Sequence, residues 1–139
     1  PVNAVLLQEV MHLSYEFRTD LDDGFLSLSE IAALKLNAEW VVLSACNTGA
    51  GVEKGSEGLT GLTKSFIYAG AKSLLVSQWA ISSFGTVEIM KHIFKNYMEY
   101  GFSKSQAHQQ AMLEMINSDV SFFNHPSMWA PFVIVGDGS

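Results

Sequence analysis

The sequence predicts an α/β domain whose sheet is at least largely parallel. Three stretches predict buried strands: 40–45 is a continuous apolar run with β-branched residues, 73–79 contains the apolar core Leu74-Leu75-Val76, and 132–135 is Phe-Val-Ile-Val. Helical patterns separate the three runs. Strands that alternate with helices favour parallel pairing, because the chain must cross over the sheet between parallel neighbours. Three firm strands are few for a sheet, which usually has about four to six.

The N-terminal third adds one short strand and one capped helix. Residues 2–7 include Val and Leu residues that fit a short strand. In residues 9–24 the apolar residues have no regular spacing, which predicts an exposed loop. Ser27 or Ser29 can accept a hydrogen bond from the first helical amides, so we expect a short helix to begin there. Glu30 would lie near the positive end of that helix dipole.

A glycine-rich loop and a helix connect the first two firm strands. The loop extends from Asn47 to Gly55, and apolar residues at helical spacing follow it as far as Ala69. Gly70 offers a C-cap for this helix, and a short connection leads to the strand at 73–79. The succession of strand, loop, helix and strand predicts a parallel pair.

Two amphipathic helices are predicted before the last strand. Apolar residues at helical spacing from Phe84 to Tyr97 indicate a long helix that ends near Gly101. Ser103 can cap a second helix, whose apolar positions include Ala107. The chain then reaches the strand at 132–135.

The composition fits one globular domain and argues against several classes of function. The chain has 139 residues, 48% of them apolar, and a net charge of −6. Nucleic-acid binding is disfavoured, because phosphate contacts need Lys and Arg. No apolar stretch approaches the about 18 residues of a membrane span, and the N-terminus has no basic leader with a cleavage site. We expect no membrane association and no cofactor.

Cys46 is the single cysteine and the first candidate for chemistry. It cannot form an internal disulfide, so we expect a reducing compartment, with the cytoplasm as the default. It follows the predicted strand at 40–45, and open α/β sheets bind ligands at the carboxyl ends of their strands. A free cysteine is also often a small buried apolar residue, and that alternative stays open. The glycine loop after it could bring backbone amides to a substrate or simply form a turn.

The histidines matter because a cysteine nucleophile generally needs a base. His92 and His108 lie within the predicted helices beside charged or amide residues, which indicates solvated helix faces. His125 precedes a proline and is expected to cap or pin the return to the last strand. Nothing in the pattern brings His12 to Cys46. No two histidines have the spacing of a metal pair, and one cysteine is too few for structural zinc.

Several blocks in this order resemble the CHAT domain, a family of caspase-like cysteine peptidase domains related to caspases and separase. The blocks lie at 41–49, 56–62, 66, 68–71, 77–79 and 125–137, and the resemblance covers residues 23–137 approximately. It implies a caspase-like three-layer α/β/α fold with a mostly parallel sheet. It also implies a cysteine endopeptidase, a class that in bacterial proteins often follows TPR repeats.

The resemblance assigns roles to particular residues. Cys46 matches the family nucleophile, and its backbone amide would be one oxyanion-hole donor. Ser77-Gln78-Trp79 resembles the strand end that holds the substrate backbone, and Trp79 would form a wall of the specificity pocket. Plain core packing is the alternative for that tryptophan. Gly49 is expected to contribute to substrate binding from the glycine loop.

Two departures from the family pattern limit the inference. The family histidine lies in a His-Gly block before the cysteine, and no histidine in this chain precedes a glycine. Either that block is shortened and its histidine lost, or residues 1–8 correspond to a later strand and the histidine lies further upstream. We favour the second alternative. After Trp79 the family commonly has an acid, whereas this chain has Ile81-Ser82-Ser83, so no charge preference for the substrate follows.

These observations predict that residues 1–139 are the C-terminal, cysteine-bearing portion of one CHAT-like domain, incomplete at the N-terminus. An upstream segment, with TPR repeats as one possibility, would supply the missing strands and the histidine. The expected function is a cysteine endopeptidase that cleaves a protein substrate through an acyl-enzyme on Cys46, and the isolated chain is expected to be inactive. The alternatives are a non-catalytic CHAT-like module that binds peptides or scaffolds a complex, and an ordinary α/β domain.

Overall fold

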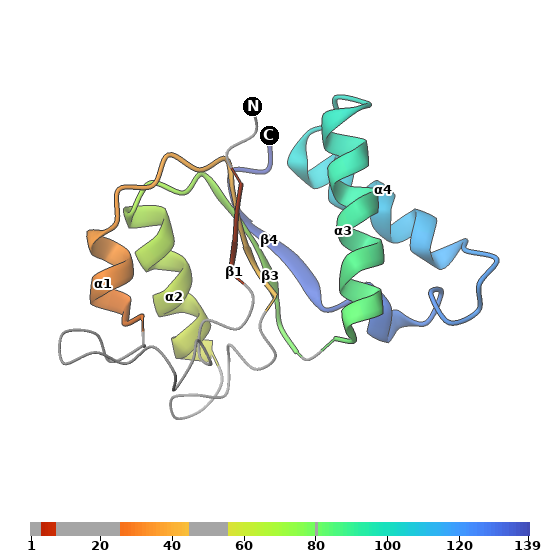
Figure 1. Cartoon of the computed structure of the whole chain (residues 1–139), viewed down its shortest axis with the longest axis horizontal. Coiled ribbons are helices and arrows are strands. Elements are labelled where there is room, and N and C mark those ends of the chain that lie inside the picture. Colours follow the sequence, from red (N-terminus) through yellow and green to blue (C-terminus); the bar gives the residue numbers. More distant parts are fainter. Residues whose placement is uncertain (1–3, 8–25, 45–55, 80) are drawn as a thin grey trace, which may run out of the picture.

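The computed structural model describes residues 4–7, 26–44, 56–79 and 81–139, with the backbone alone for 4–7 and 56–59. It is a mixed α/β structure with one four-stranded sheet and helices on both of its faces (Figure 1). The elements in chain order are β1 Ala4–Leu7, α1 Leu28–Ala33, β2 Trp40–Leu43, α2 Ser56–Tyr68, β3 Ser73–Ser77, α3 Ser83–Met98, α4 Lys104–Ile116, the 3-10 helix η1 Pro126–Met128 and β4 Phe132–Gly136.

The strands lie in the order in which they occur in the chain. β1 pairs with β2 and β2 with β3 in parallel, whereas β3 and β4 are antiparallel. The prediction of a largely parallel sheet is therefore confirmed in two of its three pairings. β4 runs the other way because two helices, α3 and α4, precede it and return the chain to the end of the sheet that it left. The short N-terminal strand, the weakest of the predicted strands, is also confirmed.

Alternate side chains of the central strands enter two separate cores. One lies toward α1 and α2, and it includes Val41, Leu43, Leu74 and Val76. The other lies toward α3 and α4, and its buried members are Trp40, Val42, Leu75, Ile89, Ile93, Ala111, Met115 and Phe132. Since neighbouring strand residues point to opposite faces, a strand with helices on both sides is mainly apolar along its length, with Ser73 and Ser77 only at the two ends of β3. This explains the continuous apolar runs in the sequence.

Serine caps define where three of the helices begin. The Ser27 hydroxyl accepts from the Glu30 amide and the Glu30 carboxylate accepts from the Ser27 amide, which forms a capping box. Ser103 and Gln106 form the same arrangement at α4. Ser82 caps α3. Each such cap satisfies amides that the helix leaves unpaired, and replacing one by alanine typically costs about 1 kcal/mol.

A cluster of charges and hydrogen bonds holds the end of the chain against the amino ends of β2 and β3. Lys104 is buried, and its ammonium group donates to the Ser139 carbonyl at 2.9 Å and lies 3.6 Å from a Glu39 carboxylate oxygen. Glu39 also binds Lys72, and this hydrogen bond lowers the pKa of the Glu39 carboxyl group. The Asp137 amide donates to the Lys72 carbonyl at 3.0 Å. The cluster lies opposite the carboxyl ends of the parallel strands.

Gly70 is required both by its backbone conformation and by its surroundings. It follows α2 with a φ of +103°, and a Cβ at this position would lie 2.2 Å from the Leu36 carbonyl oxygen. Gly101 also has a positive φ, of +68°, but a Cβ there would meet nothing within 4 Å. Comparing substitutions at the two glycines therefore distinguishes the cost of the backbone conformation from the cost of a steric clash.

We predict that Gly70→Ala is considerably more destabilising than Gly101→Ala. The left-handed conformation alone costs an L residue about 1–2 kcal/mol, which is the expected loss for Gly101→Ala. Gly70→Ala must also displace the backbone at Leu36, so we expect it to lower the free energy of unfolding by at least about 1 kcal/mol more. Urea denaturation of the two variants beside the parent measures the difference, and equal losses would contradict the steric argument.

Candidate functional site at the carboxyl ends of the parallel strands

The two central strands end side by side. Leu43 pairs with Val76, so Ser44 follows β2 where Ser77 ends β3. Ser77 is buried, and its hydroxyl donates to the Leu43 carbonyl at 3.4 Å, which links the two strand ends. The Ser77 side chain therefore helps to join β2 and β3. Its contact with a substrate remains a prediction.

The predicted nucleophile and the glycine loop lie outside the described residues. This applies to Cys46, to Gly49 and to the predicted loop at 9–24 with its histidine, His12. Their predicted roles stay predictions, and so does the alternative of a buried structural thiol. What the structure provides is the strand end from which the chain continues to Cys46, two residues after Ser44.

Ser44 is an unusual residue at this strand end. It is only 8% exposed, and its hydroxyl oxygen has no hydrogen-bond partner among the residues that the structure describes. A buried hydroxyl without a partner costs free energy, so such groups call for an explanation in the function or environment of the site. Sequence reasoning did not identify Ser44 as a site residue.

An open groove of about 370 Å³ lies between Ser44 and α3. Its other lining residues come from the first three turns of the helix, and they are Ser83, Thr86, Val87, Met90, Lys91 and Phe94. The groove thus extends from the carboxyl end of β2 along one face of α3.

The long helix at α3 is confirmed, but its predicted core face is wrong in part. Phe84 and Val87 are 76% and 53% exposed, whereas Ile89 and Ile93 are fully buried against the sheet. Apolar residues at spacings of three and four occur on two faces of this helix, and the sequence pattern did not tell which face packs. The second apolar face was the signal in the sequence that could have pointed to the groove.

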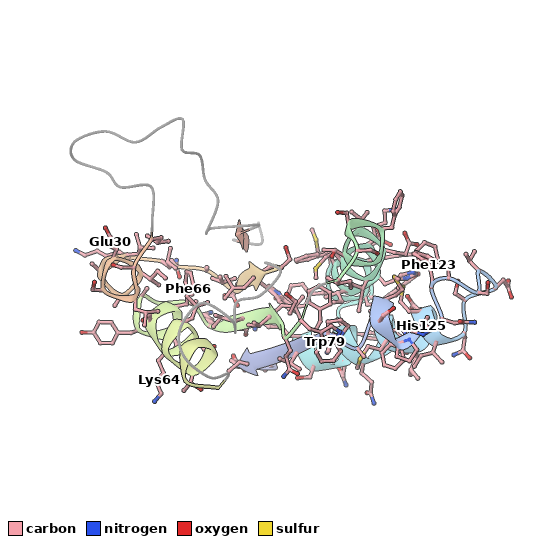
Figure 2. All side chains as sticks on the ribbon, turned by 90° about the horizontal axis from the view of Figure 1, so that it is seen from below. Glu30, Lys64, Phe66, Trp79, Phe123 and His125 are labelled. Carbon is pink, nitrogen blue, oxygen red and sulfur yellow. The ribbon has the colours of Figure 1, made fainter. Side chains whose placement is uncertain are left out.

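Trp79 lies two residues beyond β3, at the end of the sheet that Figure 2 views. Its side chain is 47% exposed, so the alternative of plain core packing is wrong. Gln78 is also exposed, and its backbone amide donates to the Pro131 carbonyl at 2.9 Å. An exposed tryptophan at a strand end is available to contact another molecule. Its role as a pocket wall remains a prediction.

Two of the histidines lie in the helices as predicted, but in different surroundings. His92 is half-buried between α3 and α4, with its two ring nitrogens near Glu88 and Glu114. His108 is buried, so the expectation of a solvated helix face is wrong for this residue. Its Nε2 has no partner within the described parts of the chain, and burial lowers the pKa of the imidazole. The rotation of α4 about its axis directs His108 inward together with Ala107 and Ala111.

His125 has the capping role that the sequence predicted. Its Nδ1 accepts from the Ser127 amide at 3.2 Å and lies 2.8 Å from the Ser127 hydroxyl, at the start of η1. Figure 2 labels His125 on the side of the sheet that carries α3 and α4. Within the described ranges, no hydrogen bond joins any of the three histidines to Ser44 or to the end of β3.

Within residues 4–7, 26–44, 56–79 and 81–139, no group of three or more His, Cys, Asp or Glu side chains is placed to hold a metal ion. None of the helices in these ranges has the length and apolar character needed to cross a membrane.

The fold and the strand ends define a mixed α/β protein with a candidate site at the carboxyl edge of its parallel strands. The chain belongs to the CHAT domain family, whose profile matches residues 3–137. Tetratricopeptide repeat protein 28 of Mus musculus is 31% identical over 116 residues, which are 84% of this chain and 5% of that protein. Its Homo sapiens counterpart is 29% identical over 116 residues, which are 84% of this chain and 4% of that protein. The chain therefore spans only a small part of these relatives.

We predict that Trp79→Ala changes stability far less than Trp40→Ala. Trp40 of β2 is fully buried against Phe94 of α3, and truncating a buried tryptophan costs about 3–5 kcal/mol. Trp79 is half-exposed, so we expect its truncation to cost less than about 1 kcal/mol. Guanidinium denaturation of both variants measures this difference. A loss of several kcal/mol for Trp79→Ala would mean that this tryptophan supports the fold.

We also predict that His108 makes stability depend on pH. Its pKa is lowered in the folded state from an ordinary value of 6.5, so the unfolded chain binds more protons as the pH falls through 6.5. The free energy of unfolding should therefore decrease from pH 7 toward pH 5. His108→Gln should flatten this decrease, because it removes the buried titrating group. Thermal unfolding across this pH range tests the prediction, and parallel curves for the parent and His108→Gln would refute it.

Proposed function

We propose that the protein containing this chain is a cysteine endopeptidase with Cys46 as its nucleophile. The observation that carries the proposal is the match to the CHAT family combined with the position of the cysteine, two residues after Ser44 at the carboxyl end of a central parallel strand. Open α/β sheets bind ligands at that edge, between neighbouring strand ends. The exposed Trp79 at the end of the adjacent strand supports a substrate site there.

The reaction would follow the general scheme of Cys/His peptidases. A histidine takes the thiol proton, and the Cys46 sulfur attacks the carbonyl carbon of the scissile peptide bond. The backbone amide of Cys46 would help to stabilise the oxyanion, and the histidinium returns its proton to the departing amine. Water, deprotonated by the same histidine, then hydrolyses the acyl-enzyme and releases the thiol.

The histidine would come from a segment outside this sequence. Two observations support this: no histidine in the chain is directly followed by a glycine, and none of the three described histidines is bonded to the strand ends. His92 and His125 have partners within α3–α4 and η1, and His108 is buried on α4. Among the described strands, β1 is paired only with β2, so its other edge can accept further strands. We therefore propose that residues 1–139 are the C-terminal portion of one caspase-like three-layer domain.

The substrate and the setting are proposals as well. The substrate would be a protein held at Gln78 and Trp79, with the glycine loop at Gly49 contributing backbone amides. The relatives are tetratricopeptide repeat proteins by name, which supports TPR repeats as a neighbouring segment. A single cysteine supports a reducing, cytoplasmic location.

A non-catalytic CHAT-like module is the second candidate function. It is favoured by the absence of a His-Gly pair from the sequence, because a peptide-binding or scaffolding module needs no histidine. Such a module would keep the strand ends, Trp79 and the groove. Its cysteine would be an ordinary thiol.

The test compares the intact protein with its Cys46→Ala variant. Each is incubated with a lysate of the source cells, and newly formed protein N-termini are identified by mass spectrometry. We expect cleavage products that disappear with Cys46→Ala and are not produced by the 139-residue chain alone. In parallel, the rate of iodoacetamide alkylation of Cys46 against pH should indicate a thiol pKa below the usual value of about 8.5.

Two outcomes would overturn the proposal. Products that persist in the Cys46→Ala variant would come from another peptidase. An absence of cleavage, together with an ordinary alkylation profile, would favour the non-catalytic module.

A further inference from the structure

The groove beside Ser44 has the size of a site for one side chain and its adjoining backbone. Its volume of about 370 Å³ lies at the lower end of the range of about 300–1,000 Å³ for small-ligand pockets. It begins at the carboxyl end of β2, the same sheet edge at which we propose that a substrate binds. Its long wall is one face of α3.

The wall of the groove is mainly apolar. Val87, Met90 and Phe94 provide most of it, and Val87 is 53% exposed. Lys91 is the one charged side chain among the lining residues, and its ammonium group lies 3.1 Å from a Glu88 carboxylate oxygen. The Lys91 side chain is 67% exposed, so its charge lies mainly in water and is not part of the apolar wall. Burying an acidic or basic side chain here would cost its hydration without a matching ion pair.

Three of the lining residues carry hydroxyl groups. Ser44, at the sheet, is more than nine-tenths buried, and its hydroxyl has no partner among the described residues. Ser83 and Thr86 belong to the first turn of α3, and the Thr86 hydroxyl already donates to the Ser82 carbonyl. A peptide backbone passing this end could give the Ser44 hydroxyl its missing hydrogen bond. An apolar wall with one unsatisfied hydroxyl at its end suits a side chain attached to a peptide.

We propose that this groove is a specificity subsite for an uncharged apolar side chain, of the size of leucine or methionine, in a bound peptide. That the bound molecule is a peptide rests on the proposed function. The groove adds the kind of side chain that the site would select. Apolar burial against α3 supplies the affinity, and the loss of hydration against Val87, Met90 and Phe94 disfavours charged residues at this position.

The test observes methionine methyl groups by NMR in the intact protein labelled with 13C-methyl methionine. Met90 lines the groove, whereas Met98 is 63% exposed on the same helix outside it, so one residue reports binding and the other is its control. Met90→Leu and Met98→Leu assign the two signals. The probes are N-acetyl-leucinamide and the corresponding aspartate and arginine amides, each titrated to millimolar concentration.

We expect the leucine amide to shift the Met90 signal in a saturable way and to leave Met98 unchanged. Val87→Trp fills the groove and should weaken this binding at least tenfold, whereas Phe84→Trp, on the same helix but not in the lining, should not weaken it. Both positions are exposed, so both variants are expected to fold, and Val87→Asp provides a second way to oppose an apolar ligand. No Met90 shift, equal shifts from all three amides, or unchanged binding in both Val87 variants would overturn the proposal.

The experiment is independent of the catalytic test, because it needs no reaction at Cys46. Binding should be the same in the Cys46→Ala variant. If selective binding holds while cleavage fails, the peptide subsite stands and the peptidase proposal falls. If cleavage depends on Cys46 while the groove binds none of the amides, the subsite proposal falls alone.

Discussion

The burial of β2 and β3 on both faces is the constraint on which the rest of the structure depends. Every residue of these strands is buried, and their alternate side chains supply two cores. Two pairs of helices are needed to cover them, which determines the layers seen in Figure 1. Because the cores take up every side chain of β2 and the three central side chains of β3, only the strand ends are available for chemistry. Ser44, Ser77 and Trp79 are at such ends.

Much of the fold could be predicted because its signals are local. The apolar run at 40–45, the capping box of Ser27 and the Gly70 cap each depend on residues within one element or its immediate neighbours. The burial of His108 and the exposure of Phe84 could not be predicted in this way. Both depend on how α3 and α4 are rotated against the sheet, and that rotation is decided by contacts between distant parts of the chain.

The candidate site, too, could be predicted only in part from the sequence. Its position after a buried strand followed from the sequence, and the CHAT blocks indicated Cys46 and Trp79 in particular. The groove was not predictable, because it joins Ser44 to residues of α3 that are about forty positions away and meet it only through the packing of helix on sheet. An unsatisfied hydroxyl such as that of Ser44 is likewise visible only when its surroundings are known.

The direction of the two outer strands has a consequence for how this unit is joined to others. Ala4 of β1 pairs with Trp40, and Gly136 of β4 pairs with Ser73, so both outer strands have their open ends where β2 and β3 begin. The Lys104 cluster holds the last residues at this same end. Polypeptide attached before β1 or after β4 would thus leave from the end of the sheet opposite the groove.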